Sequence, residues 1–171
     1  MIVRGLLFAL VLLTVLLVQT VAGSSLAIGG VAPDLVTLSV LVLAVLDGPG
    51  LGLRYGFAAG LAVDLLSGGE SVVGISALVL LIAGYLAGLA RPYLAANQFA
   101  GTVLVAAVGT AAVVAGRQLL EFLLGLDPGD AFGVALDALA TGIYGALLSP
   151  IAAFLLRRLV RLVPGPGTPT A

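Results

Sequence analysis

The side chains that could do chemistry in this sequence are few, and they form no catalytic motif. The chain contains no Cys and no His, which excludes thiol and imidazole metal sites and nucleophiles activated by histidine. Its acidic residues are scattered, without an HExxH, a phosphate-binding glycine loop or a spaced Asp cluster. Asp64 and Asp137 could form a dyad within a membrane, but neither lies in a GxGD-like context. We therefore expect a protein that is not an enzyme and uses no cofactor or metal.

One group of ionisable residues nevertheless predicts an interaction. Arg117 and Glu121 lie four residues apart, so they share one helix face and can pair. Asp64 and Asp137 lie near the same side of the predicted helices as this pair, and ionisable residues in apolar segments are functional candidates by default. Arg117 would then be shared among the three acids as a polar clasp between helices. The alternatives are that all four side chains snorkel to the membrane surface, or that they form a ligand site.

Glycines form the second pattern. They recur at four-residue spacing in two segments, as Gly52, Gly56 and Gly60 and then as Gly84 and Gly88. Such stripes of small residues let two helix backbones approach closely in a membrane. Because the chain has 24 glycines, a single pair at this spacing is weak evidence for a packing face. The three glycines in register are stronger evidence. The stripe predicts a helix-packing face, whose partner could be this chain or another protein.

The elements that must position these residues are membrane helices. Hydrophobic residues make up 61% of the chain and charged residues only 9%, whereas about a quarter of a soluble domain is charged. A crossing helix needs about 20 apolar residues, so we expect an all-α integral membrane protein with a single six-helix transmembrane bundle over residues 1–162. The predicted helices cover about residues 5–23, 33–46, 51–66, 72–90, 99–124 and 132–157, and the Pro- and Gly-rich residues 163–171 form a disordered cytoplasmic tail.

The first two helices each have an alternative interpretation. The run from Gly5 to Gly23 follows Arg4 like a signal peptide, but its length favours an uncleaved helix. The second helix opens with Pro33 and Asp34, which suit a helix start, yet it reaches only about 21 Å. The second and third segments could instead form a re-entrant hairpin, which would leave four crossings.

The arginines set the expected orientation. With six crossings, all arginines except Arg117 fall on the side that holds both termini, and most acids fall on the other side. By the positive-inside rule both termini are expected to be cytoplasmic. The four-crossing alternative would place Arg54 away from the cytoplasmic side of the membrane. No basic patch of the kind that binds nucleic acid is present.

Several of these features follow one another in a familiar order. The sequence PDL at residues 33–35 is followed by GFAAGLAVDLLSG at 56–68, GISAL at 74–78 and GYL at 84–86. This pattern resembles the family of the rod shape-determining protein MreD. It lies in about a third of the chain, and the hydropathy layout matches over nearly all of it. The sequence departs from the family in its lack of Lys and its long Pro/Gly tail, which puts in doubt only contacts made through the ends of the chain.

The resemblance implies a bacterial plasma-membrane protein that works as a non-enzymatic scaffold of the cell-elongation and cell-shape machinery. Such a protein would dock MreC and link MreB filaments to the peptidoglycan polymerase and transpeptidase. It would also be similar in fold to the substrate-binding subunits of vitamin transporters, and a carrier of that kind is the main alternative function. The chain has no Trp and four Tyr, which argues against a tight vitamin site. A generic assembly factor is a third alternative.

Overall fold

The structure, a computed structural model, is all-helical over the residues that it describes, which are 2–22, 32–67, 73–126 and 130–162. It has α1 (Ile2–Ala22), α2 (Leu35–Asp47), α3 (Pro49–Leu66), α4 (Ile75–Ala90), the 3-10 helix η1 (Arg91–Asn97), α5 (Gln98–Leu123) and α6 (Ala131–Leu162). The all-α class is therefore confirmed, with one α-helix for each predicted segment. The predicted tail at 163–171 and most of the stretch between the first two predicted helices lie outside the described residues.

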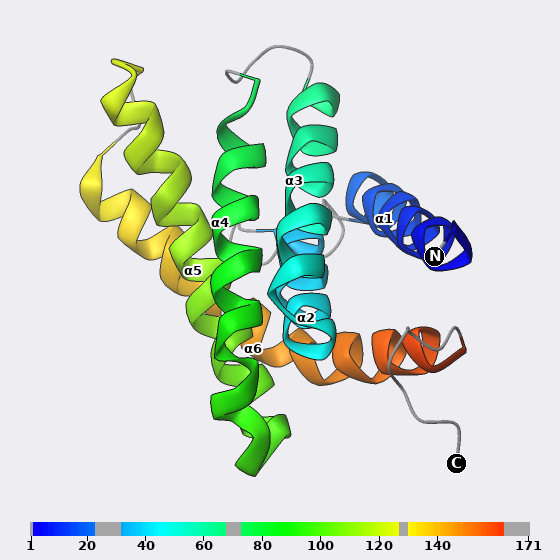
Figure 1. Cartoon of the computed structure of the whole chain (residues 1–171). Helices are drawn as coiled ribbons and strands as arrows, with labels where there is room; N and C mark the ends of the chain where they lie inside the picture. Colours follow the sequence, from blue (N-terminus) through cyan, green and yellow to red (C-terminus); the bar gives the residue numbers. More distant parts are fainter. Residues whose placement is uncertain (1, 23–31, 68–72, 127–129, 163–171) are drawn as a thin grey trace.

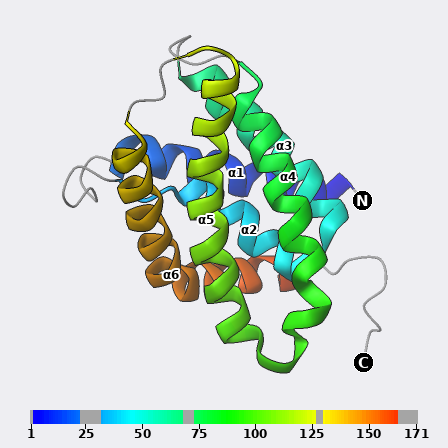
Figure 2. The ribbon, with the colours of Figure 1, turned by 90° about the vertical axis from the view of Figure 1, so that its left-hand side faces the viewer.

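The short helix α2 forms the core of the molecule. It contacts α1, α3, α4, α5 and α6, and every residue from Val36 to Val45 is buried. A helix that is apolar on all sides is stable only when other helices surround it. The helices α3, α4 and α5 stand side by side around it, whereas α1 and the last part of α6 lie across their direction (Figures 1 and 2).

Three described segments are long and apolar enough to cross a membrane, namely Ile75–Leu94, Gln98–Leu123 and Ala131–Val160. The segments Gly5–Val21 and Leu35–Asp47 are apolar but shorter. These helices are those of a membrane protein, since an apolar stretch of this length is typical of a transmembrane helix. Six crossings remain a prediction.

A single residue joins α2 to α3. The sequence predicts a turn over residues 47–50, but α2 continues to Asp47 and α3 already begins at Pro49. Gly48 has a φ of 100°, which favours glycine because it has no Cβ to clash. Pro49 then occupies the first turn of α3, where its missing N–H costs nothing. The predicted turn is therefore shorter than expected.

The last helix is longer than predicted and contains a proline. The sequence predicts that it ends near residue 157, but α6 continues through the arginine cluster to Leu162. Pro150 lies inside α6 and has no N–H to donate to the carbonyl of Ala146. The Ser149 hydroxyl donates to that carbonyl instead, at 2.9 Å. The part of α6 that follows turns across the base of the bundle (Figure 1).

Candidate functional site

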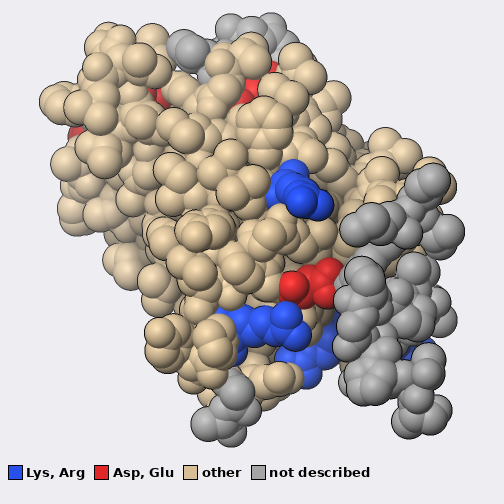
Figure 3. Space-filling view, viewed as in Figure 1, with Lys and Arg blue, Asp and Glu red and all other residues tan. Residues whose placement is uncertain are grey.

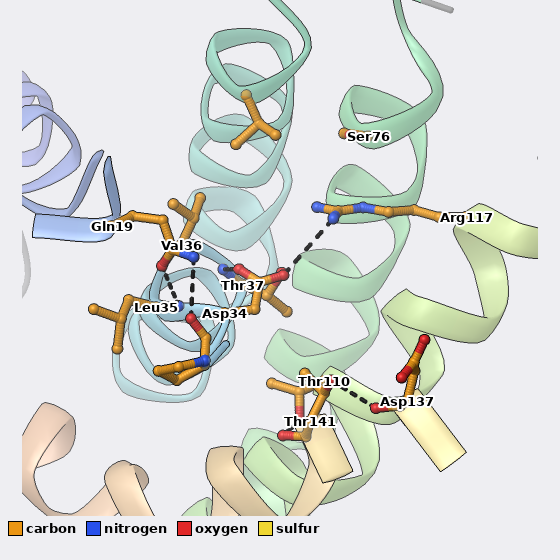
Figure 4. Close-up of polar contacts among 12 residues, drawn as sticks. Gln19, Asp34, Leu35, Val36, Thr37, Ser76, Thr110, Arg117, Asp137 and Thr141 are labelled. Atoms are coloured by element: carbon orange, nitrogen blue, oxygen red, sulfur yellow. Dashed lines mark hydrogen bonds and ion pairs between the residues drawn. The ribbon is translucent and has the colours of Figure 1, made fainter. Parts of the chain in front are cut away.

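A polar pocket of about 390 Å³ opens beside the N-terminal end of α2. Its walls come from α1, α2, α3, α5 and α6, together with the residues just before α2. Figure 4 shows its polar side chains, with Arg117 reaching from α5 toward Asp34. The lining residues are Gln19, Ala32, Asp34, Val36, Val63, Val114, Arg117, Asp137 and Thr141.

Asp34 is the central residue of the polar pocket. Its carboxylate caps α2 by accepting hydrogen bonds from the backbone N–H of Thr37 at 2.9 Å and from the Thr37 hydroxyl at 2.5 Å. The same carboxylate lies 3.8 Å from Nη1 of Arg117. Asp34 therefore stabilises the start of the central helix and pairs with α5 at once. The sequence predicts the first of these roles but not the second.

Gln19 on α1 holds the backbone on both sides of Asp34. Its side-chain amide donates to the carbonyl of Pro33 at 3.0 Å, and its carbonyl oxygen accepts from the N–H of Leu35 at 2.8 Å. Sequence reasoning missed this residue. The available signal was weak, because it consists of one amide side chain within an otherwise apolar segment.

The predicted clasp is only partly assembled. Among the described residues, Arg117 forms its ion pair with Asp34 and not with Glu121, Asp64 or Asp137. Asp137 lies in the wall of the same pocket, and its backbone carbonyl accepts a hydrogen bond from the Thr141 hydroxyl at 2.7 Å. Glu121 lies one turn beyond Arg117 on α5. Arg117 pairs with Asp34 because α2 lies at the centre of the bundle. This position brings Asp34, at the start of α2, closer to α5 than the acids of the other helices.

Asp64 belongs to a different arrangement, which we name the Asp64 tie. Its carboxylate is only 1% exposed and accepts three hydrogen bonds from backbone N–H groups at the start of α4. The distances are 2.8 Å to Gly74, 3.2 Å to Ser76 and 3.2 Å to Ala77. The N-cap residue of α4 is Gly74, which has no side chain to satisfy these groups. Asp64 on α3 therefore supplies the missing cap from a neighbouring helix.

The glycine stripe is the contact between α3 and α4. A Cβ placed on Gly52 would overlap the carbonyl oxygen of Gly84, and one on Gly56 would overlap that of Leu80. A Cβ on Gly60 would lie 2.5 Å from Cα of Ala77. The two backbones touch along this seam, so the packing partner that the sequence left open is α4 of the same chain.

The other two glycines of the predicted face, Gly84 and Gly88, lie on α4 and face the same contact. A Cβ on Gly84 would overlap the carbonyl oxygen of Gly52, and one on Gly88 would lie 2.5 Å from the backbone nitrogen of Pro49. Close approach of backbones is the arrangement that small residues permit between membrane helices. All five glycines of the predicted face therefore belong to one internal contact, which we call the glycine seam.

The chemistry that these residues can perform is mostly structural. The hydroxyls of Ser39, Thr102 and Ser149 each donate to a carbonyl of their own helix, and Thr110 also reaches the carbonyl of Thr141 across to α6 at 3.2 Å. Within the described ranges, no three acidic side chains gather where they could hold a metal ion. The polar pocket thus contains one cation and two carboxylates, of which Asp34 pairs with Arg117 and joins the start of α2 to α5.

The pairing of Asp34 with Arg117 can be measured by a double-mutant cycle. Asp34→Asn should keep the cap on α2, because Asn caps as well as Asp, and lose only the charge. The coupling energy between Asp34→Asn and Arg117→Gln should be about 0.5–1 kcal/mol, as for a partly exposed ion pair. Thermal stability in detergent is the readout. The coupling between Arg117→Gln and Asp64→Asn, which the predicted clasp requires, should be near zero, and the reverse ranking would contradict this assignment.

Comparison with known proteins gives one match. A family model described as rod shape-determining protein MreD matches residues 1–163 of the chain. No match was found among curated proteins or among solved structures. The likeness in fold to vitamin-transporter subunits therefore stays a prediction.

Proposed function

This chain belongs to the MreD family of rod shape-determining proteins, and from that premise we propose that it is a non-enzymatic membrane scaffold of the bacterial cell-elongation machinery. The observation that supports this best is how its buried and half-buried polar groups are used. The carboxylate of Asp64 and the amide of Gln19 bind backbone groups of neighbouring segments, and the carboxylate of Asp34 caps its own helix, α2. Polar side chains used in this way build a rigid framework and leave no set of groups poised for a reaction.

We infer that the partner-binding surface is an apolar groove of about 420 Å³ between α1, the start of α2 and the last part of α6. Its occupant would be the membrane segment of MreC, because an apolar helix laid into an apolar groove is a common mode of recognition. The groove is lined by Leu7, Leu10, Val11, Thr14, Val15, Val18, Leu35, Leu38, Ser39, Ala152, Leu155, Leu156 and Leu159.

An exposed apolar face of α1 adjoins this groove and shares Leu10 with it. Leu6, Leu10, Leu13 and Leu17 are all more than half exposed, and their spacings of four, three and four residues are those of a helix–helix seam. Contacts of α1 within the chain are with α2 and α3. A helix that is covered on one side and apolar on the other has room for a second helix from a partner.

The proposed orientation follows from the basic residues. Arg91 lies where α4 ends, and Arg157 and Arg158 lie on the last part of α6. Most basic side chains in Figure 3 lie in its lower half, with one acidic patch just above them, and the other acidic side chains lie near the upper edge. We place the basic end in the cytoplasm, with several crossings and both termini inside. Through MreC, the scaffold would link MreB filaments inside the cell to the peptidoglycan polymerase and transpeptidase outside.

Cysteine cross-linking tests the groove, because the chain has no Cys of its own. Leu10→Cys places a thiol in the groove, and Leu104→Cys places one on α5 away from it. The two leucines are matched in exposure, at 62% and 60%. With single cysteines introduced along the membrane segment of MreC, Leu10→Cys should form disulfides with a helical period, and Leu104→Cys should form few.

The outcomes separate two parts of the proposal. If MreC co-purifies with the wild-type chain in mild detergent but cross-links equally well to both positions, the groove is the wrong surface. If MreC cannot be recovered from an otherwise intact membrane extract, the scaffold role itself is wrong.

A further inference from the structure

A second groove lies at the basic end of the molecule, between the start of α5 and the part of α6 that follows Pro150. Its volume is about 390 Å³, within the usual range for ligand sites. The walls include Phe99, Val103, Pro150 and Phe154, and Arg157 and Arg158 lie at its edge. We propose that this basic groove binds the anionic headgroup of a phospholipid. The inference is independent of the scaffold role.

Arg157 supplies the first argument. Its Nε is buried and has no hydrogen-bond partner among the described residues. A buried donor without a partner destabilises the protein, and more so when it is charged. Arg157 forms no ion pair with a described residue either. The guanidinium is therefore held in place with unused donors, and its planar fork matches a phosphate group.

Other basic groups reinforce the charge at this position. The guanidinium of Arg158 stacks over the Phe154 ring, with its carbon 5.5 Å from the ring centroid, which fixes its direction without neutralising it. Arg157 also borders a neighbouring cavity of about 200 Å³ together with Arg91. Three cations thus line two cavities that share Arg157.

The remaining walls suit the apolar part of a lipid. Phe99, Val103 and Phe154 line the groove beside the two arginines, and both Phe side chains are more than 60% exposed. A soluble anion would need only the arginines, whereas a phospholipid would use the cationic edge and the apolar wall together. Basic pockets between membrane helices on the cytoplasmic side are known to take anionic lipid headgroups.

The bend in α6 explains why this sequence builds the groove. Pro150 turns the helix across the base of the bundle (Figure 1), and the Ser149 hydroxyl satisfies the carbonyl that the proline leaves free. Orientation in the membrane would require only that arginines be exposed on the cytoplasmic side. It does not require a buried, unpaired guanidinium nitrogen beside an apolar cavity.

The test uses the purified full-length chain in mixed micelles of phosphatidylglycerol and phosphatidylcholine, with bound lipid counted by native mass spectrometry. The wild-type protein should retain phosphatidylglycerol preferentially. In the variant R157Q/R158Q, the preference for phosphatidylglycerol over phosphatidylcholine should fall about 30-fold, which corresponds to about 1 kcal/mol per arginine. R54Q is the matched control, because Arg54 is exposed on α3 outside the groove, and it should bind like the wild type.

Two further measurements separate the possible outcomes. V103F should fill the apolar side of the groove and lower lipid retention while all charges remain, and it decides the matter if R157Q/R158Q does not fold. Glycerol 3-phosphate, which has the same phosphate but no acyl chains, should not displace the lipid. The proposal is overturned if R157Q/R158Q keeps the wild-type preference for phosphatidylglycerol. Equal loss in R54Q, or displacement by glycerol 3-phosphate, would overturn it as well.

Discussion

Gly56→Ala should destabilise the protein by about 1–3 kcal/mol, although the same change in most helices is neutral or favourable. The added methyl group would overlap the carbonyl oxygen of Leu80 on α4 and lie 2.9 Å from the carbon of that carbonyl. A backbone group cannot rotate away as a side chain can, so α3 and α4 must move apart. The readout is the temperature at which half of the protein loses its monodisperse peak after heating in detergent.

Gly50 offers a matched control on the same helix. It is exposed, and a Cβ at this position would meet no atom within 4 Å. Gly50→Ala should therefore be neutral or stabilise the protein by up to about 1 kcal/mol, because alanine favours the helix. The two changes are chemically identical, but only Gly56→Ala should destabilise the protein. Equal effects would mean that the glycine seam does not set the spacing of α3 and α4.

Asp64→Leu should have the largest effect of any single change considered. It would leave the backbone N–H groups of Gly74, Ser76 and Ala77 without their acceptor, at about 1–3 kcal/mol for each group that stays buried. Asp64→Asn keeps one acceptor oxygen and loses the charge, so it should cost less, about 1–2 kcal/mol. The amount of folded protein recovered from membranes and its thermal stability are the measurements.

Asp130 provides the comparison for the Asp64 tie. It is exposed and accepts a hydrogen bond from the N–H of Gly133 at 2.9 Å, as an ordinary cap of α6. Asp130→Asn should change stability little, because Asn is an equally good cap residue at the surface. If Asp64→Asn were as mild as Asp130→Asn, the buried charge would not be what holds the start of α4.

The positions of the helices could be predicted from the sequence, but their arrangement could not. Each predicted segment contains one α-helix, because an apolar run bounded by Gly, Pro or charged residues leaves little choice of secondary structure. The predicted and observed helix ends differ where local backbone conformation decides them, as at Gly48 between α2 and α3 and beyond Pro150 in α6. The central place of α2 could not be foreseen, because a fully apolar helix gives no sign of which side faces lipid and which faces protein.

The same limit explains the outcome for the candidate site. The sequence identifies the charged side chains that could pair, but which of them do so depends on which helices are neighbours. It predicts Asp34 as a helix cap only, because the distance between Asp34 and Arg117 along the chain carries no information about their 3.8 Å separation. The glycine spacing, in contrast, is a local pattern, and it identified a helix-packing face whose members meet in the structure. The family resemblance was confirmed by the match over residues 1–163.

The glycine seam has a mechanical consequence. Where side chains separate two helices, the helices can slide as rotamers change, but α3 and α4 meet through backbone atoms that have no alternative positions. The Asp64 tie fixes the same pair at one end. We therefore expect α3 and α4 to move as one rigid body. Movement within the protein would then occur between this rigid unit and helices that pack less extensively against it, such as α1.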